Sequence, residues 1–228
     1  MYPIKIIFIF CLLIASDTDA FSQRLEKFVS RERSHERNGA IVPVAYPDIA
    51  NYFGYLAPDT SSRSAQAEPA KTYLYFWLRE NVSELGIRVI SPVPELVFPD
   101  KGDIASESYM INEKDKADSF SPSFKLYKAK GISPATTYNA KPGEIEWSFI
   151  AENDKQKDEP WTQVNKKNYT LVRLQDQSTD ASKTDRSGFY KLVIFTTDTL
   201  SSTGSFLVQV GSTSDIKSIK IAEKPEGM

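Results

Sequence analysis

The sequence has few of the side chains on which catalytic and metal sites most often depend. Its 228 residues include one cysteine, Cys11, and one histidine, His35. One cysteine excludes a disulfide within the chain and a site of several thiolates, and one histidine leaves little for triads that need an imidazole. His35 lies in the charged run Arg31–Arg37, where we expect a solvated side chain. These absences favour a protein that is not an enzyme.

The chain also lacks a net charge that would attract a charged polymer. The sequence has 28 lysine and arginine residues and 30 aspartate and glutamate residues, which gives a formal charge of -2. Without a strong positive field we expect no binding to nucleic acid. Glycine-rich loops with the spacing of phosphate-binding motifs are absent from the sequence as well.

The first 20 residues have the pattern of a secretory signal peptide. Lys5 precedes the unbroken apolar run Ile6–Ala15, and Thr18–Ala20 provides a small-x-small cleavage site. The apolar run is shorter than the roughly 20 residues that a membrane-spanning helix needs. Cys11 lies inside this run behind bulky residues, so it is no clear lipidation site and membrane association stays open. We expect export to the periplasm, the outer-membrane surface or the extracellular space.

The rest of the sequence divides into a charged arm and a β-rich domain. In the arm, residues 21–40, apolar residues within Leu25–Val29 have helical spacing. Over residues 41–222, short β-rich runs are separated by turn-forming residues, and residues 223–228 form a flexible tail. About ten strands at this spacing predict an all-β fold, a jelly-roll-like antiparallel β-sandwich with a short N-terminal helical arm.

Alternation along the strands predicts which faces are covered. In Thr72–Arg79, the residues that point to either face of a strand are apolar or aromatic, which predicts a central strand with both faces covered. Gly188–Thr197 has the composition of an interior strand. In Ile145–Phe149 and Ser205–Val210, apolar residues alternate with polar ones. That pattern predicts half-buried strands with one wet face.

Two groups of residues are candidates for binding. Tyr73, Tyr75 and Trp77 share one parity and would form an aromatic platform for sugar rings, although packing against a second sheet or the arm is the alternative. Calcium is the metal that the composition permits, because it binds hard oxygen ligands. The densest acidic loop contains Glu152, Asp154, Asp158 and Glu159. Two lysines interrupt this loop and it lacks the spacing of an EF-hand, so a solvated loop is the alternative there.

Several segments of the chain resemble the major surface lipoprotein family of Leptospira in order and spacing, from about Val44 to Gly211. They are Asn51–Tyr55, Tyr73–Trp77 continued by Glu84–Pro92, Gly188–Lys191, Phe195–Thr197 and Gly204–Phe206. The resemblance implies a jelly-roll β-sandwich without enzymatic activity, exported to the bacterial envelope. In the Leptospira member it also implies association with calcium and with host matrix proteins such as fibronectin, laminin and collagen.

The resemblance also implies where calcium would bind. In that family an Asp-Thr pair at the start of a strand, a run of aspartates and a tyrosine hold the ion. Here Ser121 and Pro122 replace the Asp-Thr pair, the mixed loop Glu152–Glu159 replaces the aspartate run, and Tyr169 matches in place. Since an anionic ligand is lost, we expect at most a weak calcium site and no other cofactor. Its candidate ligands are Glu152, Asp154, Asp158, Glu159 and Tyr169.

These observations predict a non-enzymatic envelope or extracellular protein that binds an extracellular protein or a polysaccharide. Two alternatives remain open. One is a carbohydrate-binding module that uses Tyr73, Tyr75 and Trp77. The other is a hydrolase or lyase on a jelly-roll frame, which would need a cleft with paired carboxylates.

Overall fold

The computed structural model describes most of the chain after the predicted signal peptide. The described residues are 27–57, 70–112, 115, 117–132, 144–153, 162–164, 167–175, 185–196, 203–214 and 219–225. The predicted signal peptide, residues 1–20, lies outside them, and so do the calcium candidates Asp154, Asp158 and Glu159. Among the described residues, no helix combines the length and the apolar character needed to cross a membrane.

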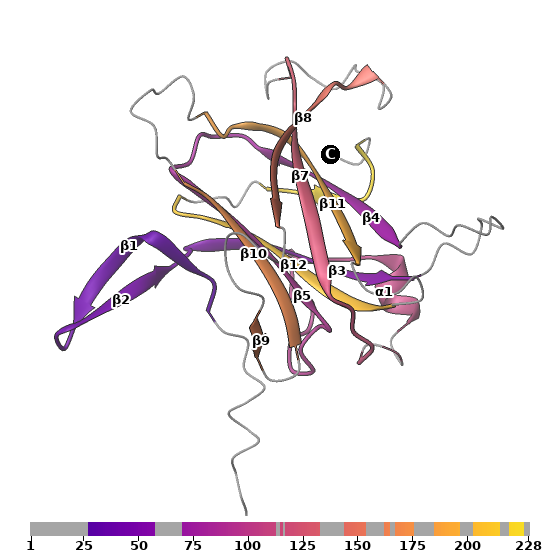
Figure 1. Ribbon diagram of the computed structural model, residues 1–228, viewed down its shortest axis with the longest axis horizontal. Coiled ribbons are helices and arrows are strands. Elements are labelled where there is room, and N and C mark those ends of the chain that lie inside the picture. Colours follow the sequence, from indigo (N-terminus) through magenta and orange to yellow (C-terminus); the bar gives the residue numbers. More distant parts are fainter. Residues whose placement is uncertain are drawn as a thin grey trace, which may run out of the picture.

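Two β-sheets lie face to face (Figure 1). One has the order β6 (Ile104–Ala105), β3 (Asp48–Leu56), β12 (Gly204–Ser212), β5 (Glu84–Ser91), β10 (Lys167–Gln175) and β9 (Thr162–Val164). The other has the order β13 (Ile221–Ala222), β4 (Lys71–Leu78), β11 (Gly188–Thr196), β7 (Pro122–Ala129) and β8 (Trp147–Asn153). Neighbouring strands are antiparallel except for β3 and β6. The predicted all-β sandwich is confirmed, while a jelly-roll strand order stays a prediction.

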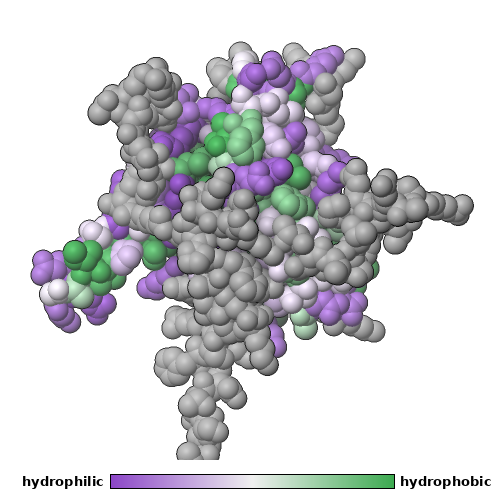
Figure 2. Space-filling view, viewed as in Figure 1, coloured by the Kyte–Doolittle hydropathy of each residue, from purple (hydrophilic) through white to green (hydrophobic). Residues whose placement is uncertain are grey.

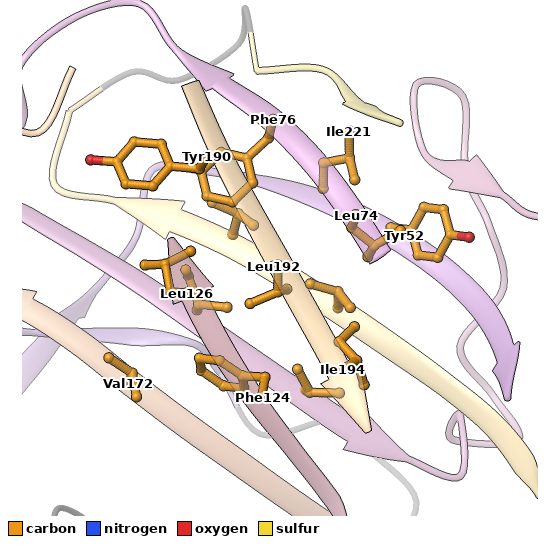
Figure 3. Close-up of a cluster of buried hydrophobic side chains, with 14 of the residues drawn as sticks. Tyr52, Leu74, Phe76, Phe124, Leu126, Val172, Tyr190, Leu192, Ile194 and Ile221 are labelled. Atoms are coloured by element: carbon orange, nitrogen blue, oxygen red, sulfur yellow. The ribbon is translucent and has the colours of Figure 1, made fainter. Parts of the chain in front are cut away.

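The core lies between the two sheets (Figure 3). Because successive side chains of a strand point to opposite faces, alternate residues of each sheet enter this layer. The five-stranded sheet contributes Leu74, Phe76, Phe124, Leu126, Tyr190, Leu192 and Ile194. The six-stranded sheet contributes Tyr52, Leu85, Ile87, Val89, Phe206, Val208 and Val210. Burial of these aliphatic and aromatic groups is the main force that holds the two sheets together.

The outer face of the six-stranded sheet is covered by the chain itself, so every residue of β5 and β12 is buried. Val93 and Tyr109, from the segment between β5 and β7, pack on this face, and Tyr109 belongs to the short helix α1 (Glu107–Ile111). Phe28 and Tyr46 cover a second part of it. The wet face predicted for Ser205–Val210 is therefore wrong, because alternation along a strand does not reveal what covers its polar side.

The five-stranded sheet also differs in part from expectation. β11 is its middle strand, as predicted for Gly188–Thr197. β4 is not central, because its neighbour on one side is the two-residue strand β13, and Tyr73 keeps 40% of its surface exposed. The prediction that both faces of Thr72–Arg79 are covered is therefore wrong for the outer face.

The predicted helix in the arm is wrong for the residues that the structure describes. β1 (Val29–Arg37) and β2 (Ala40–Ala45) form a hairpin that projects from the sandwich (Figure 1). Asn38 and Gly39 have φ angles of 53° and 78°, the left-handed values that a tight two-residue hairpin turn requires. Strand pairing through this turn prevails over the short run of helical spacing near Phe28. In the same view, hydrophobic and hydrophilic surfaces lie side by side on the hairpin (Figure 2).

The C-terminal boundary predicted at residue 223 falls one residue after β13. The hydroxyl of Tyr52 donates a hydrogen bond of 2.5 Å to the carboxylate of Glu223. The first residue of the predicted tail is therefore bonded to a core side chain. Burial first, and this hydrogen bond second, raise the pKa of Tyr52.

Gly54 provides a test of the packing between β3 and β12. It lies opposite Phe206, and a Cβ atom at this position would clash with the Phe206 ring. We predict that Gly54→Ala lowers the free energy of unfolding by about 1–3 kcal/mol in urea denaturation, because the buried ring must shift. The double variant Gly54→Ala/Phe206→Leu should lose less than the sum of the single losses. Full stability of Gly54→Ala would contradict the close packing.

Candidate binding surface

Aromatic side chains from four strands gather on the outer face of the five-stranded sheet. The cross-strand register pairs Phe189 with Trp77, Lys191 with both Tyr75 and Tyr127, and Tyr127 with Phe149. Directly opposite residues share a face of the sheet, so these side chains all point away from the core. We call this surface the aromatic face and define it by Tyr73, Tyr75, Trp77, Tyr127, Trp147, Phe149, Phe189 and Lys191.

The rings of the aromatic face pack on one another. Phe189 stacks on Trp77 with 4.8 Å between ring centroids, and on Tyr75 with 5.9 Å. Trp147 is tilted against both Phe189 and Tyr75, at 5.6 and 6.0 Å. Tyr73, Tyr75 and Trp77 thus share a face as predicted, but Tyr75 and Trp77 are half-buried against their neighbours. They do not form an open row of rings.

The ammonium group of Lys191 lies among these rings. Lys191 Nζ is 4.5 Å from the Trp147 ring centroid and 5.0 Å from that of Tyr127. Both distances fall within the range of cation–π attraction. Partial burial lowers the pKa of Lys191, because a desolvated ammonium group is less favourable than a neutral amine.

The edge of the aromatic face is more exposed than its centre. Phe149 is 55% exposed, and its ring makes an edge contact of 5.8 Å with Tyr127. Beside it, Ile150 is 39% exposed. Lys125 and Glu152 follow on the same side with an ion pair of 3.6 Å. The surface therefore has packed aromatic rings at its centre and exposed apolar and charged groups at its edge.

The predicted burial of the apolar side of Ile145–Phe149 is wrong, because Trp147 and Phe149 lie on the outer face and β8 contains a bulge after Phe149. Leu126 pairs with Ala151 while Tyr127 pairs with Phe149, so Ile150 is an extra residue in β8. A bulge changes which residues face the core, and a strictly alternating pattern cannot represent it. The consecutive apolar pair Phe149 and Ile150 was the available signal in the sequence.

The structure does not bring the described calcium candidates together. Glu152 lies on β8, on the outer side of the five-stranded sheet, beside Lys125. Tyr169 lies on β10 of the other sheet and packs against the cluster of Phe53 and Ile90. Within the described ranges, no group of three or more His, Cys, Asp or Glu residues is placed to hold a metal ion.

A buried carboxylate anchors the hairpin, which sequence reasoning did not identify. Glu84 is fully buried on the outer side of β5, where it accepts hydrogen bonds from the Ser30 hydroxyl at 2.9 Å and from the Tyr46 hydroxyl. Arg173 Nε lies 3.9 Å from the same carboxylate. Burial first, and the bond to Glu84 second, raise the pKa of Tyr46. These contacts join both ends of the hairpin to the sandwich.

Two glycines provide space for the aromatic part of this anchor. A Cβ atom at Gly86 would lie 2.6 Å from the Tyr46 hydroxyl oxygen and 2.8 Å from Phe28 Cζ, and one at Gly211 would lie 2.8 Å from Tyr46 Cδ2. Phe28 and Tyr46 contact each other edge to face at 4.7 Å, and the Arg88 guanidinium lies 4.8 Å from the Phe28 ring centroid. The base of the hairpin is therefore packed tightly on β5 and β12.

Glu84→Gln tests the anchor. We predict a loss of about 2–4 kcal/mol in the free energy of unfolding, because Arg173 loses its buried partner and the hydroxyl groups lose a charged acceptor. Amide hydrogen exchange in β1 should accelerate. The matched control is Glu146→Gln, which removes an exposed carboxylate paired with Lys130 and should cost no more than about 1 kcal/mol. Equal losses in both variants would show that Glu84 does not anchor the hairpin.

Comparison with known proteins identifies the family. The search of curated proteins found no match to the chain. The model of a family described as surface lipoprotein of the Spirochaetales order matches residues 40–221. The match extends from the first residue of β2 to the first residue of β13, so it includes both sheets and the aromatic face. It confirms the family predicted from the resembling segments. The chain therefore belongs to the spirochaete surface lipoprotein family and is an exported protein associated with the cell envelope.

Proposed function

We propose that this protein is a non-enzymatic adhesion protein that binds an extracellular protein on its aromatic face. The observation that supports the proposal is the arrangement of exposed apolar groups, Tyr73, Phe149 and Ile150, around half-buried aromatic rings. Protein interfaces are enriched in Tyr, Trp and Phe at their centres, and a few such residues supply most of the binding energy.

The contrast between the two outer faces supports this choice of surface. On the six-stranded sheet, the apolar outer residues Phe53, Ile90 and Leu207 are buried beneath segments of the same chain. On the five-stranded sheet, Tyr73 and Phe149 keep large exposed fractions in the part of the chain that is described. Exposed apolar surface of this kind commonly marks an interaction site.

The geometry favours a protein partner over a polysaccharide. Sugar rings bind to aromatic side chains that offer an open face to solvent. Stacking on Phe189 occupies one face each of Tyr75 and Trp77, and Trp147 lies tilted beside them. The central ammonium group of Lys191 would suit a partner that places a carboxylate among apolar side chains.

The double variant Tyr73→Ala/Phe149→Ala tests the aromatic face. Suitable partners are immobilised fibronectin, laminin and collagen, the matrix proteins that the family resemblance suggests. We predict binding about tenfold to a hundredfold weaker than that of the parent, because two interface side chains are truncated. Surface plasmon resonance measures the affinities.

The control is Leu96→Ala/Phe98→Ala, which removes two other side chains with exposed fractions of 64% and 67%. It should bind as the parent does. Equal loss in the control, or parental affinity in the double variant, would contradict the role of the aromatic face. Quenching of tryptophan fluorescence by polysaccharides, with no binding to the three proteins, would favour the carbohydrate-binding alternative instead.

Calcium binding is proposed to be weak. With a Kd near 1 mM, 1 mM calcium would stabilise the folded protein by about 0.4 kcal/mol, which corresponds to a rise in Tm of roughly 1–2 °C. Calorimetric titration and thermal denaturation measure both quantities, and Asp154→Ala/Asp158→Ala should abolish the effect. A rise above about 5 °C at this concentration would show a strong site and contradict the proposal.

A further inference from the structure

The hairpin of β1 and β2 is fixed at its base and exposed along the rest of its length. Residues 33–41 are all exposed, and Ile41 at the start of β2 keeps 79% of its surface. Two-stranded hairpins on their own are marginally stable in water. The hairpin adds little to the core, and yet it is held in place by the buried hydrogen bonds of Glu84 and by close packing on Gly86 and Gly211. Such an arrangement favours a role in contacts outside the domain.

Strand geometry separates the charges of β1 onto two faces. From Ser34 to Arg37, where the pairing with β2 is regular, His35 and Arg37 lie on one face and Ser34 and Glu36 on the other. Arg33 is exposed in the preceding stretch, where the register shifts. His35 and Arg37 are therefore about 7 Å apart along one face of the hairpin, and Arg33 adds a second exposed guanidinium close to them in the sequence. The register places His35 opposite Val42 and Arg37 opposite Ala40, so no acidic residue of β2 neutralises this face.

Among the described residues, β1 and β2 form a sheet of two strands, and no other strand pairs with the second edge of β1. An edge strand offers backbone N–H and C=O groups to another extended chain. An added strand has the same two-residue period, so its alternate side chains would lie beside His35 and Arg37.

We propose that β1 binds an extended acidic peptide segment of a partner protein by strand addition. Backbone hydrogen bonds along Ser34–Arg37 supply affinity, and acidic side chains of the peptide pair with Arg37 and with the exposed Arg33. Charge alone suits a sulfated polysaccharide less well, because Glu36 lies in the same strand and the chain has a formal charge of -2. This site is separate from the aromatic face and does not depend on the function proposed for it.

The test uses a fluorescent synthetic peptide of ten residues in which glutamate and threonine alternate. Binding to the mature protein is followed by fluorescence anisotropy at low ionic strength. We expect Arg33→Glu/Arg37→Glu to weaken binding at least about tenfold, because two attractive charges become repulsive. The matched control, Lys101→Glu/Lys220→Glu, makes the same change in net charge at exposed positions outside the hairpin and should bind as the parent does.

A second pair of peptides separates strand addition from simple charge attraction. One peptide is N-methylated at the odd-numbered amides and the other at the even-numbered amides. Each peptide keeps its charge, but one of its two backbone edges can no longer donate hydrogen bonds. At least one of them should bind about tenfold more weakly than the parent peptide. Three outcomes would overturn the proposal. The first is that the parent protein does not bind the peptide at concentrations up to about 1 mM, and the second is that Arg33→Glu/Arg37→Glu binds it as tightly as the parent does. The third is that both N-methylated peptides bind with full affinity and that dextran sulfate displaces them.

Discussion

The two-residue period of β11 is the constraint on which the rest of the structure depends. Tyr190, Leu192 and Ile194 enter the core, while Phe189 and Lys191 point to the aromatic face. One strand therefore determines both the packing of the two sheets and the composition of the candidate surface. A slip of one residue would place the Lys191 ammonium in the core and expose three large apolar groups, so the register is strongly specified.

The two central strands of the six-stranded sheet, β5 and β12, are buried on both sides, which requires partners for their polar groups. Arg88 Nε donates to Gln209 Oε1 at 3.0 Å, and Gln209 Nε2 donates to Asn51 Oδ1 at 3.0 Å. Asn51 Nδ2 in turn donates to Asp103 Oδ1 at 3.0 Å, which links β5, β12 and β3 to the segment beside β6. Because unpaired polar groups would be costly in this layer, the chain of bonds also fixes the strands relative to one another.

Sequence reasoning succeeded where one local pattern determines the outcome and failed where distant segments do. The strand predicted at Gly188–Thr197, and the shared face of Tyr73, Tyr75 and Trp77, follow from alternation and turn residues. The roles of Glu84 and Trp147 do not follow from such patterns. The role of Glu84 depends on the hairpin that packs on β5, and that of Trp147 depends on the bulge in β8. Helical spacing in the arm was overridden by the turn at Asn38 and Gly39. Tertiary contacts decided each of these cases.

The two candidate surfaces belong to different layers of the molecule. The hairpin is seated on Gly86 and Gly211, on the outer side of the six-stranded sheet, whereas the aromatic face lies on the outer side of the other sheet. The packed core of the sandwich lies between them. A partner that occupies both surfaces at once would gain affinity, because its second contact becomes intramolecular.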